Sequence, residues 1–316
     1  MKSIIKPILK SKIKVKIATL SLILAIILSS IGCGKVDKIE IIEETEEQEE
    51  TIEQTQNETT KQDENVGQYR TLEQLRKMEL KTYSSTFLEG GKRNTYDFAN
   101  EEDILQISYE FKYAIEDYFR GCGASFWTSE KDEQFFPEDI EYLVTAIAYK
   151  ESSYRCNVIN ELGCGGLTGL NKKELLETLQ NQWLVKNIWG NNIPYVNCNS
   201  EEVDIFNPTT CIEYTYYNIG YNLANRLKLD KEFTYKGERR KLSEVIDYSK
   251  EDMFDRLIAA SHLFGLNNVV TAAFGDKFDK DGNKIDVNQY LYSDYVEDVL
   301  AKKYELKNTY ENKYSK

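Results

Sequence analysis

The chain has only one histidine, His262, among its 316 residues. Any mechanism that needs a histidine base must therefore use this residue. A Ser–His–Asp hydrolase would also need a Gly-x-Ser-x-Gly elbow, and the sequence has none. A lone histidine in an apolar helical stretch is more often a hydrogen-bonded wall residue than a base. We therefore expect His262 to line the wall of a site and not to drive hydrolysis.

Basic residues are few relative to acidic ones. The chain has 40 Lys and Arg against 53 Asp and Glu, which gives a formal net charge of −13. Because no basic patch is visible that could neutralise phosphates, the balance argues against DNA or RNA as a partner. A neutral or weakly charged glycan remains compatible with it.

The sequence also has no apolar run of the about 20 residues that a membrane-spanning helix needs. Its most apolar stretch, residues 17–31, follows a segment with six lysines and no acid. Because the stretch leads into Gly32-Cys33, residues 1–33 are similar to a lipoprotein signal peptide in which Cys33 becomes the lipidated N-terminus. An ordinary signal peptide and an uncleaved anchor are the alternatives. Lipidation would anchor the protein to the cell membrane, facing the cell wall.

Residues 34–67 are expected to form a disordered acidic tether. Residues 36–66 contain 12 acids and 2 lysines, which gives a net charge of −10. Such a segment has too little apolar surface to offset chain entropy, and its like charges repel one another. Much of the negative charge of the chain therefore belongs to the tether and not to the folded domain.

The remaining residues, 68–316, suffice for one substantial core. Apolar residues at three- and four-residue spacings predict a helix within residues 98–121, with Asn100 as its cap. Two short hairpins are expected, at residues 233–238 and around Asp281-Gly282. The fold class is therefore mostly α with small β-hairpin insertions and an N-terminal helical extension. Further helices are predicted at residues 175–189, 211–227, 252–264 and 294–304.

Glu151 stands at the end of an apolar helix. Pro137 in the first turn and Ser152-Ser153 at the end predict that this helix covers residues 137–152. Partial burial and the negative end of the helix dipole both favour a protonated carboxyl group, which suits a general acid. A solvated glutamate at a helix end is the alternative. The apolar residues that share its face are Ile140, Leu143, Val144 and Ile147.

Four motifs stand in order along the chain, and the first has two parts, residues 151–154, Glu-Ser-Ser-Tyr, and residues 163–168, Gly-Cys-Gly-Gly-Leu-Thr. This first motif resembles the Glu-Ser-x-aromatic and Gly-Ala-x-Gly-Leu-Met-Gln segments of the lytic transglycosylase family, in the lysozyme superfamily. Residues 206–212, Phe-Asn-Pro-Thr-Thr-Cys-Ile, match its Asp-Pro-x-x-Asn-Ile segment. Residues 259–265, Ala-Ala-Ser-His-Leu-Phe-Gly, resemble its third motif, and Tyr295-Val296 matches the pair that opens the last helix.

The resemblance covers residues 137–303 and implies a lysozyme-like transglycosylase domain. This domain would cleave the β-1,4 bond between N-acetylmuramic acid and N-acetylglucosamine and close a 1,6-anhydro ring. Glu151 would be the single acid and base, and neither a metal nor a cofactor is implied. The resemblance places substrate contacts at Ser152, Tyr154, Gly166, Leu167, Thr168, His262 and Tyr295.

The chain also departs from the family pattern. Thr168 and Gly169 stand where the family has Met-Gln, so an amide that lines the family's sugar cleft is absent. Cys211 replaces the Asn of the Asp-Pro-x-x-Asn-Ile segment. These changes leave the proposed acid intact, and we expect His262 and Tyr295 to compensate by packing on the sugar.

No second catalytic acid stands out near Glu151. Glu161 and Glu174 are near in sequence, but a solvated loop or helix face explains each of them better. A single acid would fit a mechanism in which the sugar's own N-acetyl group assists in place of a second carboxylate. Residues 277–288 do not match a calcium loop, because lysine and asparagine occupy its first and twelfth ligand positions.

Five cysteines remain after the proposed lipidation cysteine, an odd number for an exported chain. Their connectivity is undecidable from the sequence, and no spacing matches a zinc site. The preferred bridges are Cys156–Cys164, which would pin the turn after the proposed acid, and Cys198–Cys211.

Two other functions stay open at this point. A hydrolytic muramidase shares the fold and leaves reducing ends, whereas a non-catalytic peptidoglycan-binding lipoprotein would bind the wall without cutting it. The expected partners are peptidoglycan glycan strands and the membrane, through the anchor at Cys33. Surface-tethered enzymes of this kind often serve secretion or conjugation machinery, or wall remodelling.

Overall fold

The computed structural model describes residues 69–89, 91–121, 136, 138–181, 196–219, 227 and 232–314. The expected signal peptide and tether, residues 1–33 and 34–67, lie outside the described residues, as does Cys122. Within the described ranges, no helix is both long and apolar enough to cross a membrane.

Helices dominate the described residues, and the mostly α fold class is confirmed. The helices are α2 Leu72–Arg76, α3 Glu101–Gly121, α4 Ile140–Ser152, α5 Lys172–Asn181, α7 Pro208–Tyr217, α8 Met253–Phe264, α9 Leu266–Ala273, α10 Asn288–Leu291 and α11 Asp294–Tyr314. A 3-10 turn, η3, covers Leu242–Glu244. The antiparallel strand pairs are β1 Thr82–Glu89 with β2 Lys92–Ala99, β3 Cys164–Gly165 with β4 Leu170–Asn171, and β5 Glu232–Tyr235 with β6 Glu238–Lys241.

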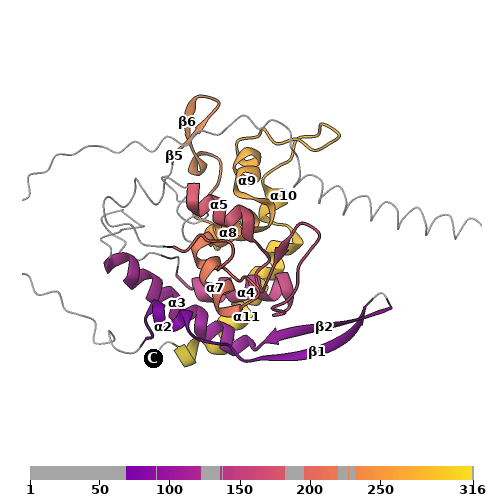
Figure 1. Cartoon of the computed structure of the whole chain (residues 1–316). Helices are drawn as coiled ribbons and strands as arrows, with labels where there is room; N and C mark the ends of the chain where they lie inside the picture. Colours follow the sequence, from indigo (N-terminus) through magenta and orange to yellow (C-terminus); the bar gives the residue numbers. More distant parts are fainter. Residues whose placement is uncertain are drawn as a thin grey trace, which may run out of the picture.

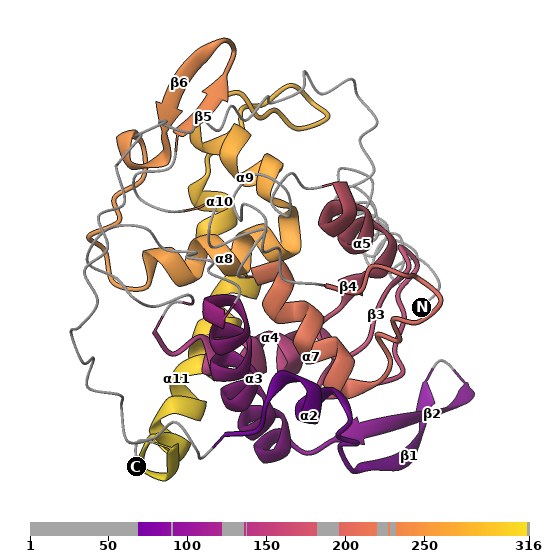
Figure 2. The ribbon, with the colours of Figure 1, turned by 60° about the vertical axis from the view of Figure 1, so that its left-hand side comes forward.

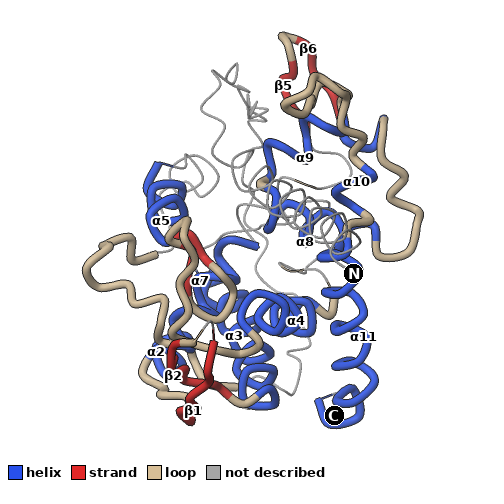
Figure 3. The backbone as a smooth tube through the Cα atoms, turned by 90° about the vertical axis from the view of Figure 1, so that its right-hand side faces the viewer, coloured by secondary structure: helices blue, strands red, loops and turns tan. Residues whose placement is uncertain are grey.

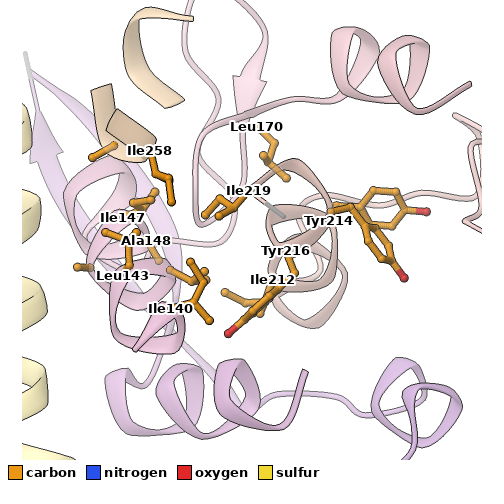
Figure 4. Packing of buried hydrophobic residues seen from close by; sticks show 14 of the residues in the cluster. Ile140, Leu143, Ile147, Ala148, Leu170, Ile212, Tyr214, Tyr216, Ile219 and Ile258 are labelled. Carbon is orange, nitrogen blue, oxygen red and sulfur yellow. The ribbon is translucent and has the colours of Figure 1, made fainter. Parts of the chain in front are cut away.

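Helix α4 lies at the centre of the described fold, between α3 and α11 (Figure 3). Its apolar face is fully buried, as the spacing predicts, and Figure 4 shows Ile140 and Leu143 facing Ile212 of α7. Its other face is buried too, and there Glu141 pairs with Lys112 of α3 at 3.2 Å. Because residues 140–148 of α4 are all buried, the core fixes the position from which its C-terminal turn emerges.

Charged pairs hold α8 and α11 together beside α4. Lys303 of α11 and Asp255 of α8 form a buried ion pair at 2.5 Å. Burial raises the pKa of Asp255, and the Lys303 ammonium acts against this effect. Arg256 of α8 also binds Glu297 of α11 at 2.6 Å. Since removing one partner of a buried pair leaves an uncompensated charge, these contacts fix how α8 and α11 face each other.

The predicted helix ends agree in part with the structure. Helix α3 begins after Asn100, whose Oδ1 accepts a hydrogen bond from the Glu102 N–H at 2.9 Å, so the predicted cap is confirmed. Helix α8 agrees to within one residue. Helix α4 begins at Ile140, three residues later than predicted, because Asp139 has a left-handed φ of 61° and cannot continue a helix. The predicted buried side of α3 is confirmed at Ile104, Ile107, Phe111 and Ile115, with Tyr118 partly buried.

Three other predicted helices differ in extent. Helix α11 runs ten residues beyond the predicted end at Tyr304. Helix α5 begins at Lys172 and α7 at Pro208, each three residues earlier than expected, and the predicted continuations of both fall largely outside the described residues.

Both predicted hairpin positions hold turns. The β5–β6 hairpin turns at Lys236-Gly237, and Asp279 Oδ1 accepts hydrogen bonds from the N–H groups of Asp281 and Asn283 around the second turn. The β1–β2 hairpin was not predicted, and it lies between α2 and α3, where an N-terminal helical extension was expected. Figures 1 and 2 show this hairpin projecting from the helical body.

Candidate active site

Glu151 is the penultimate residue of α4, in the last turn as the sequence predicts. Its side chain is 20% exposed, so the carboxyl group is neither fully buried nor freely solvated. The chain leaves the helix through Ser153 and Tyr154, two consecutive non-glycine residues with positive φ, 53° and 65°. Such conformations are costly for side-chain-bearing residues and persist only where the surroundings impose them. The turn after Glu151 is therefore a constrained one.

Tyr295 is the direct partner of Glu151. Its hydroxyl, on the first turn of α11, donates a hydrogen bond to Glu151 Oε1 at 2.5 Å. Burial and the neighbouring carboxylate raise the pKa of Tyr295 well above its usual value, so the phenol stays a donor at physiological pH. The bond holds the carboxyl group in one orientation. Among the described residues, no hydrogen bond reaches the other oxygen, Oε2.

Gly169 closes on the second oxygen of Glu151. Its φ is +63°, and a Cβ built on it would lie 2.7 Å from Glu151 Oε2. A residue with a side chain would therefore collide with the carboxyl group and also be strained. The family's amide is absent at this position, and the Gly169 backbone lies close to the Glu151 carboxyl group in its place.

Thr168 faces the core instead of a ligand. Its side chain is fully buried, and its Oγ1 lies 2.6 Å from Thr215 Oγ1 of α7. Its backbone carbonyl oxygen lies 2.9 Å from His262 Nε2. A carbonyl only accepts hydrogen bonds, so Nε2 must carry the hydrogen. Thr168 therefore holds the Gly169 turn in position, and its side chain is buried in the core.

His262 lies behind the carboxyl group, not beside an open surface. Its side chain is only 5% exposed, and Nε2 is 4.0 Å from Glu151 Oε1, beyond hydrogen-bond distance. Nδ1 is buried and has no hydrogen-bond partner among the described residues. The side chain therefore has little exposed surface with which to pack on a sugar. The residue instead connects α8 to the turn that carries Gly169.

The other residues expected to contact substrate make contacts within the fold. Ser152 Oγ bonds the Ala148 carbonyl at 2.9 Å, and the Tyr154 hydroxyl donates to Glu101 Oε2 at 2.8 Å. Leu167 is fully buried. Gly166 has a φ of +74°, and a Cβ there would lie 2.2 Å from the Ile205 carbonyl oxygen. In this structure none of these four residues presents a side chain to a ligand.

The predicted disulfides are wrong, because Cys156, Cys164, Cys198 and Cys211 are all free thiols. Burial raises the pKa of the Cys156 thiol to about 12. Asn160 has the role that a bridge was expected to have. Its Oδ1 accepts hydrogen bonds from the Leu162 and Cys164 N–H groups at 2.9 and 3.0 Å, which closes the turn without a covalent link.

The two acids near Glu151 in sequence stand in solvent. Glu161 and Glu174 are both exposed, and the Glu174 N–H bonds Asn171 Oδ1 at the start of α5. Within the described ranges, no cluster of His, Cys, Asp and Glu side chains could hold a metal ion. Sequence reasoning missed the Glu151–Tyr295 bond and the Gly169 contact. The glycine at position 169, where the family has Gln, was the sequence signal for the Gly169 contact.

Taken together, these contacts give one partly exposed carboxyl group with an oriented phenol on one oxygen. Such a group can donate a proton from Oε2 and take one back while Tyr295 holds it in place. Comparison with protein-family models and with curated proteins finds no match for the chain. The features that bear on function are therefore this constellation and the order of the motifs.

Proposed function

We propose that this chain is a peptidoglycan lytic transglycosylase with a lysozyme-like catalytic domain. The observation that carries the proposal is the Glu151 carboxyl group, 20% exposed at the end of a buried helix, with Tyr295 on Oε1 and no hydrogen bond from the described residues on Oε2. A proton donor to a glycosidic oxygen needs such a free, oriented oxygen. The four ordered motifs supply the reaction class.

In the first step Glu151 gives its proton to O4 of N-acetylglucosamine as the bond from C1 of N-acetylmuramic acid to O4 breaks. The N-acetyl carbonyl oxygen of the muramic acid bonds to C1 at the same time and takes the place of a second carboxylate. In the second step the Glu151 carboxylate takes the proton of the C6 hydroxyl. O6 bonds to C1, and the N-acetyl oxygen leaves. The acid is regenerated and no water is consumed.

Tyr295, Gly169 and His262 would act on Glu151 and not on the sugar. Tyr295 orients the carboxyl group, and the closeness of Gly169 limits the space around Oε2. His262 holds the Gly169 turn through the Thr168 carbonyl. Orientation of this kind lowers the barrier because the acid is already in place when substrate binds.

Replacing Glu151 with Gln tests the role of the acid. The amide keeps the shape and can still accept from Tyr295, but it cannot exchange a proton in either step. We expect the full-length Glu151→Gln chain to unfold at the wild-type temperature and to release no soluble muropeptides from isolated sacculi. Wild-type release by this variant would remove Glu151 from the mechanism. A wild-type chain that binds sacculi and releases nothing would be a wall-binding lipoprotein instead.

We further propose that the protein acts at the cell membrane, facing the wall, through lipid at Cys33. The basic and apolar halves of residues 1–33 carry this proposal. Cys33→Ser should leave the protein unprocessed or release it from the membrane fraction. Membrane retention of a processed Cys33→Ser chain would contradict lipid anchoring at this residue.

A further inference from the structure

The β1–β2 hairpin has two faces of different chemistry. In an antiparallel pair, directly opposed residues share a face, and the register pairs Tyr83 with Phe98. The same face holds Phe87 and Tyr96. The ring centroids lie 5.4 Å apart for Tyr83–Phe98, 5.8 Å for Phe87–Phe98 and 6.3 Å for Phe87–Tyr96. We call these four residues the aromatic face.

The opposite face is built mainly from hydroxyl side chains. Ser84 donates to Asp97 at 2.5 Å, and Thr86 and Thr95 lie 2.9 Å apart. Both faces stand in solvent, yet only one carries rings, and on it Tyr83 is 59% and Phe87 44% exposed. Cross-strand aromatic pairs stabilise a two-stranded hairpin, and exposed clustered apolar surface also marks interaction sites.

The hairpin is joined to the turn that follows Glu151. The Ala99 N–H bonds the Tyr154 carbonyl at 3.0 Å, and the Cys156 N–H bonds the Asp97 carbonyl at 2.7 Å. The Arg155 guanidinium lies 4.7 Å from the centre of the Tyr96 ring. The aromatic face therefore starts within a few residues of the proposed acid and runs outward along the strands from Tyr83 to Phe87, a reach of about 13 Å.

We propose that the aromatic face binds the peptidoglycan glycan strand beyond the bond being cut. This rests on the proposed function. Ring faces bury the C–H surface of a sugar and leave its hydroxyls in water, and a row of rings suits a row of sugars. Peptidoglycan also carries carboxylates, and the Arg155 guanidinium beside the Tyr96 ring brings positive charge to this face of a chain with net charge −13. The position beside the Glu151 turn makes the face continuous with the proposed site.

A lipid surface fits the hairpin less well. Leu88, its most exposed apolar residue at 74%, lies on the face opposite the rings. The apolar groups therefore do not gather on one side of the tip, as insertion into a membrane would require. The rings are instead spread along the strands, from Phe98 near the body to Phe87 further out.

Binding without cleavage separates this proposal from the catalytic one. The full-length Glu151→Gln chain is sedimented with isolated sacculi, and the same background carries Tyr83→Ser with Phe87→Ser. The matched control is Ser84→Ala with Thr86→Ala, on the same strand and the opposite face. We expect at least fivefold weaker binding for the first pair and unchanged binding for the control. Phe87→Tyr, which keeps a ring, should bind as the parent does.

The active chain gives a second readout. With Tyr83 and Phe87 replaced, kcat on whole sacculi should stay within twofold while KM rises. A changed circular dichroism spectrum would identify variants in which the hairpin is unfolded. Sacculus binding at the parent level by the ring variants would overturn the proposal. Two further results would overturn it, both with sacculus binding unchanged. The ring variants would lose flotation with phosphatidylglycerol vesicles, or they would lose a dimer that the parent chain forms. If no anhydro products form but the ring variants still lose binding, the aromatic face stands and the catalytic proposal falls.

Discussion

At the scale of single residues, Tyr295 decides which oxygen of Glu151 is free to act. Its hydroxyl occupies Oε1, which leaves Oε2 for a substrate. Hydrogen bonds to a charged partner contribute more than neutral ones, about 1.5–3 kcal/mol each. Losing this bond should therefore be felt in the reaction rate even though the ring remains.

Tyr295→Phe should lower kcat by at least tenfold, a loss of about 1.4 kcal/mol of transition-state stabilisation, with KM little changed. The ring still packs against the core, so the melting temperature should shift only slightly. Steady-state kinetics on isolated sacculi checks the rate, and calorimetry checks the fold. Wild-type kcat in Tyr295→Phe would mean that the phenol only fills space.

His262 calls for a different pair of variants, because the buried ring affects both stability and rate. His262→Leu leaves the Thr168 carbonyl without its donor, which should cost about 1–3 kcal/mol of unfolding free energy and slow the reaction. His262→Gln places an amide N–H near the position of Nε2 and should recover part of both. Denaturant titration and kinetics measure the two effects. Equal behaviour of the two variants would show that the bond to Thr168 is unimportant.

At the scale of elements, the turn between β3 and β4 brings the backbone to the carboxyl group. Gly169 in this turn and Gly163, just before β3, both have positive φ, +63° and +78°. A Cβ at Gly163 meets no atom within 4 Å, whereas one at Gly169 meets Glu151 Oε2. The two glycines thus share the conformational requirement and differ only in the collision.

Gly163→Ala and Gly169→Ala form a matched test. Both should lose about 1 kcal/mol because a left-handed alanine is strained. Only Gly169→Ala should also displace the Glu151 carboxyl group, so its activity should fall by more than tenfold while Gly163→Ala keeps its rate. Equal activities would show that the carboxyl group tolerates a methyl neighbour.

Local patterns predicted the elements but not their contacts. The apolar spacing before Glu151 and the Asn100 cap are decided within a few residues, and the structure agrees with both. The Glu151–Tyr295 bond joins residues 144 apart, and no local pattern records such a pairing. The two-residue alternation of rings at Tyr96 and Phe98 was visible in the sequence and would have predicted β2. The free cysteines could not be predicted from their spacing, and Asn160 closes the turn before Cys164 by hydrogen bonds.

At the scale of the whole molecule, buried tyrosines make stability depend on alkaline pH. Burial is the main reason that the pKa of each of four tyrosines rises from 10 to about 12. Unfolded phenols lose protons near pH 10, so between pH 10 and 12 the unfolded chain binds fewer protons than the folded one. Stability is then fully present below pH 10 and falls as pH rises through that window. The four residues are Tyr69, Tyr109, Tyr142 and Tyr235.

Phenolate absorbance measured against pH tests this directly. In the native chain a fraction of the 22 tyrosines should titrate well above pH 10, whereas in denaturant all should titrate together near 10. The melting temperature should fall over the same window. Superimposable titration curves for native and denatured protein would contradict the burial of these side chains.

The central claim is that one carboxyl group acts first as acid and then as base, without water. Digesting sacculi in ¹⁸O-labelled water and analysing the products by mass spectrometry tests it most directly. The predicted result is 1,6-anhydromuramic acid ends without label from the wild-type chain, and no cleavage by Glu151→Gln. Reducing ends that carry one ¹⁸O atom would identify a hydrolytic muramidase and contradict the account.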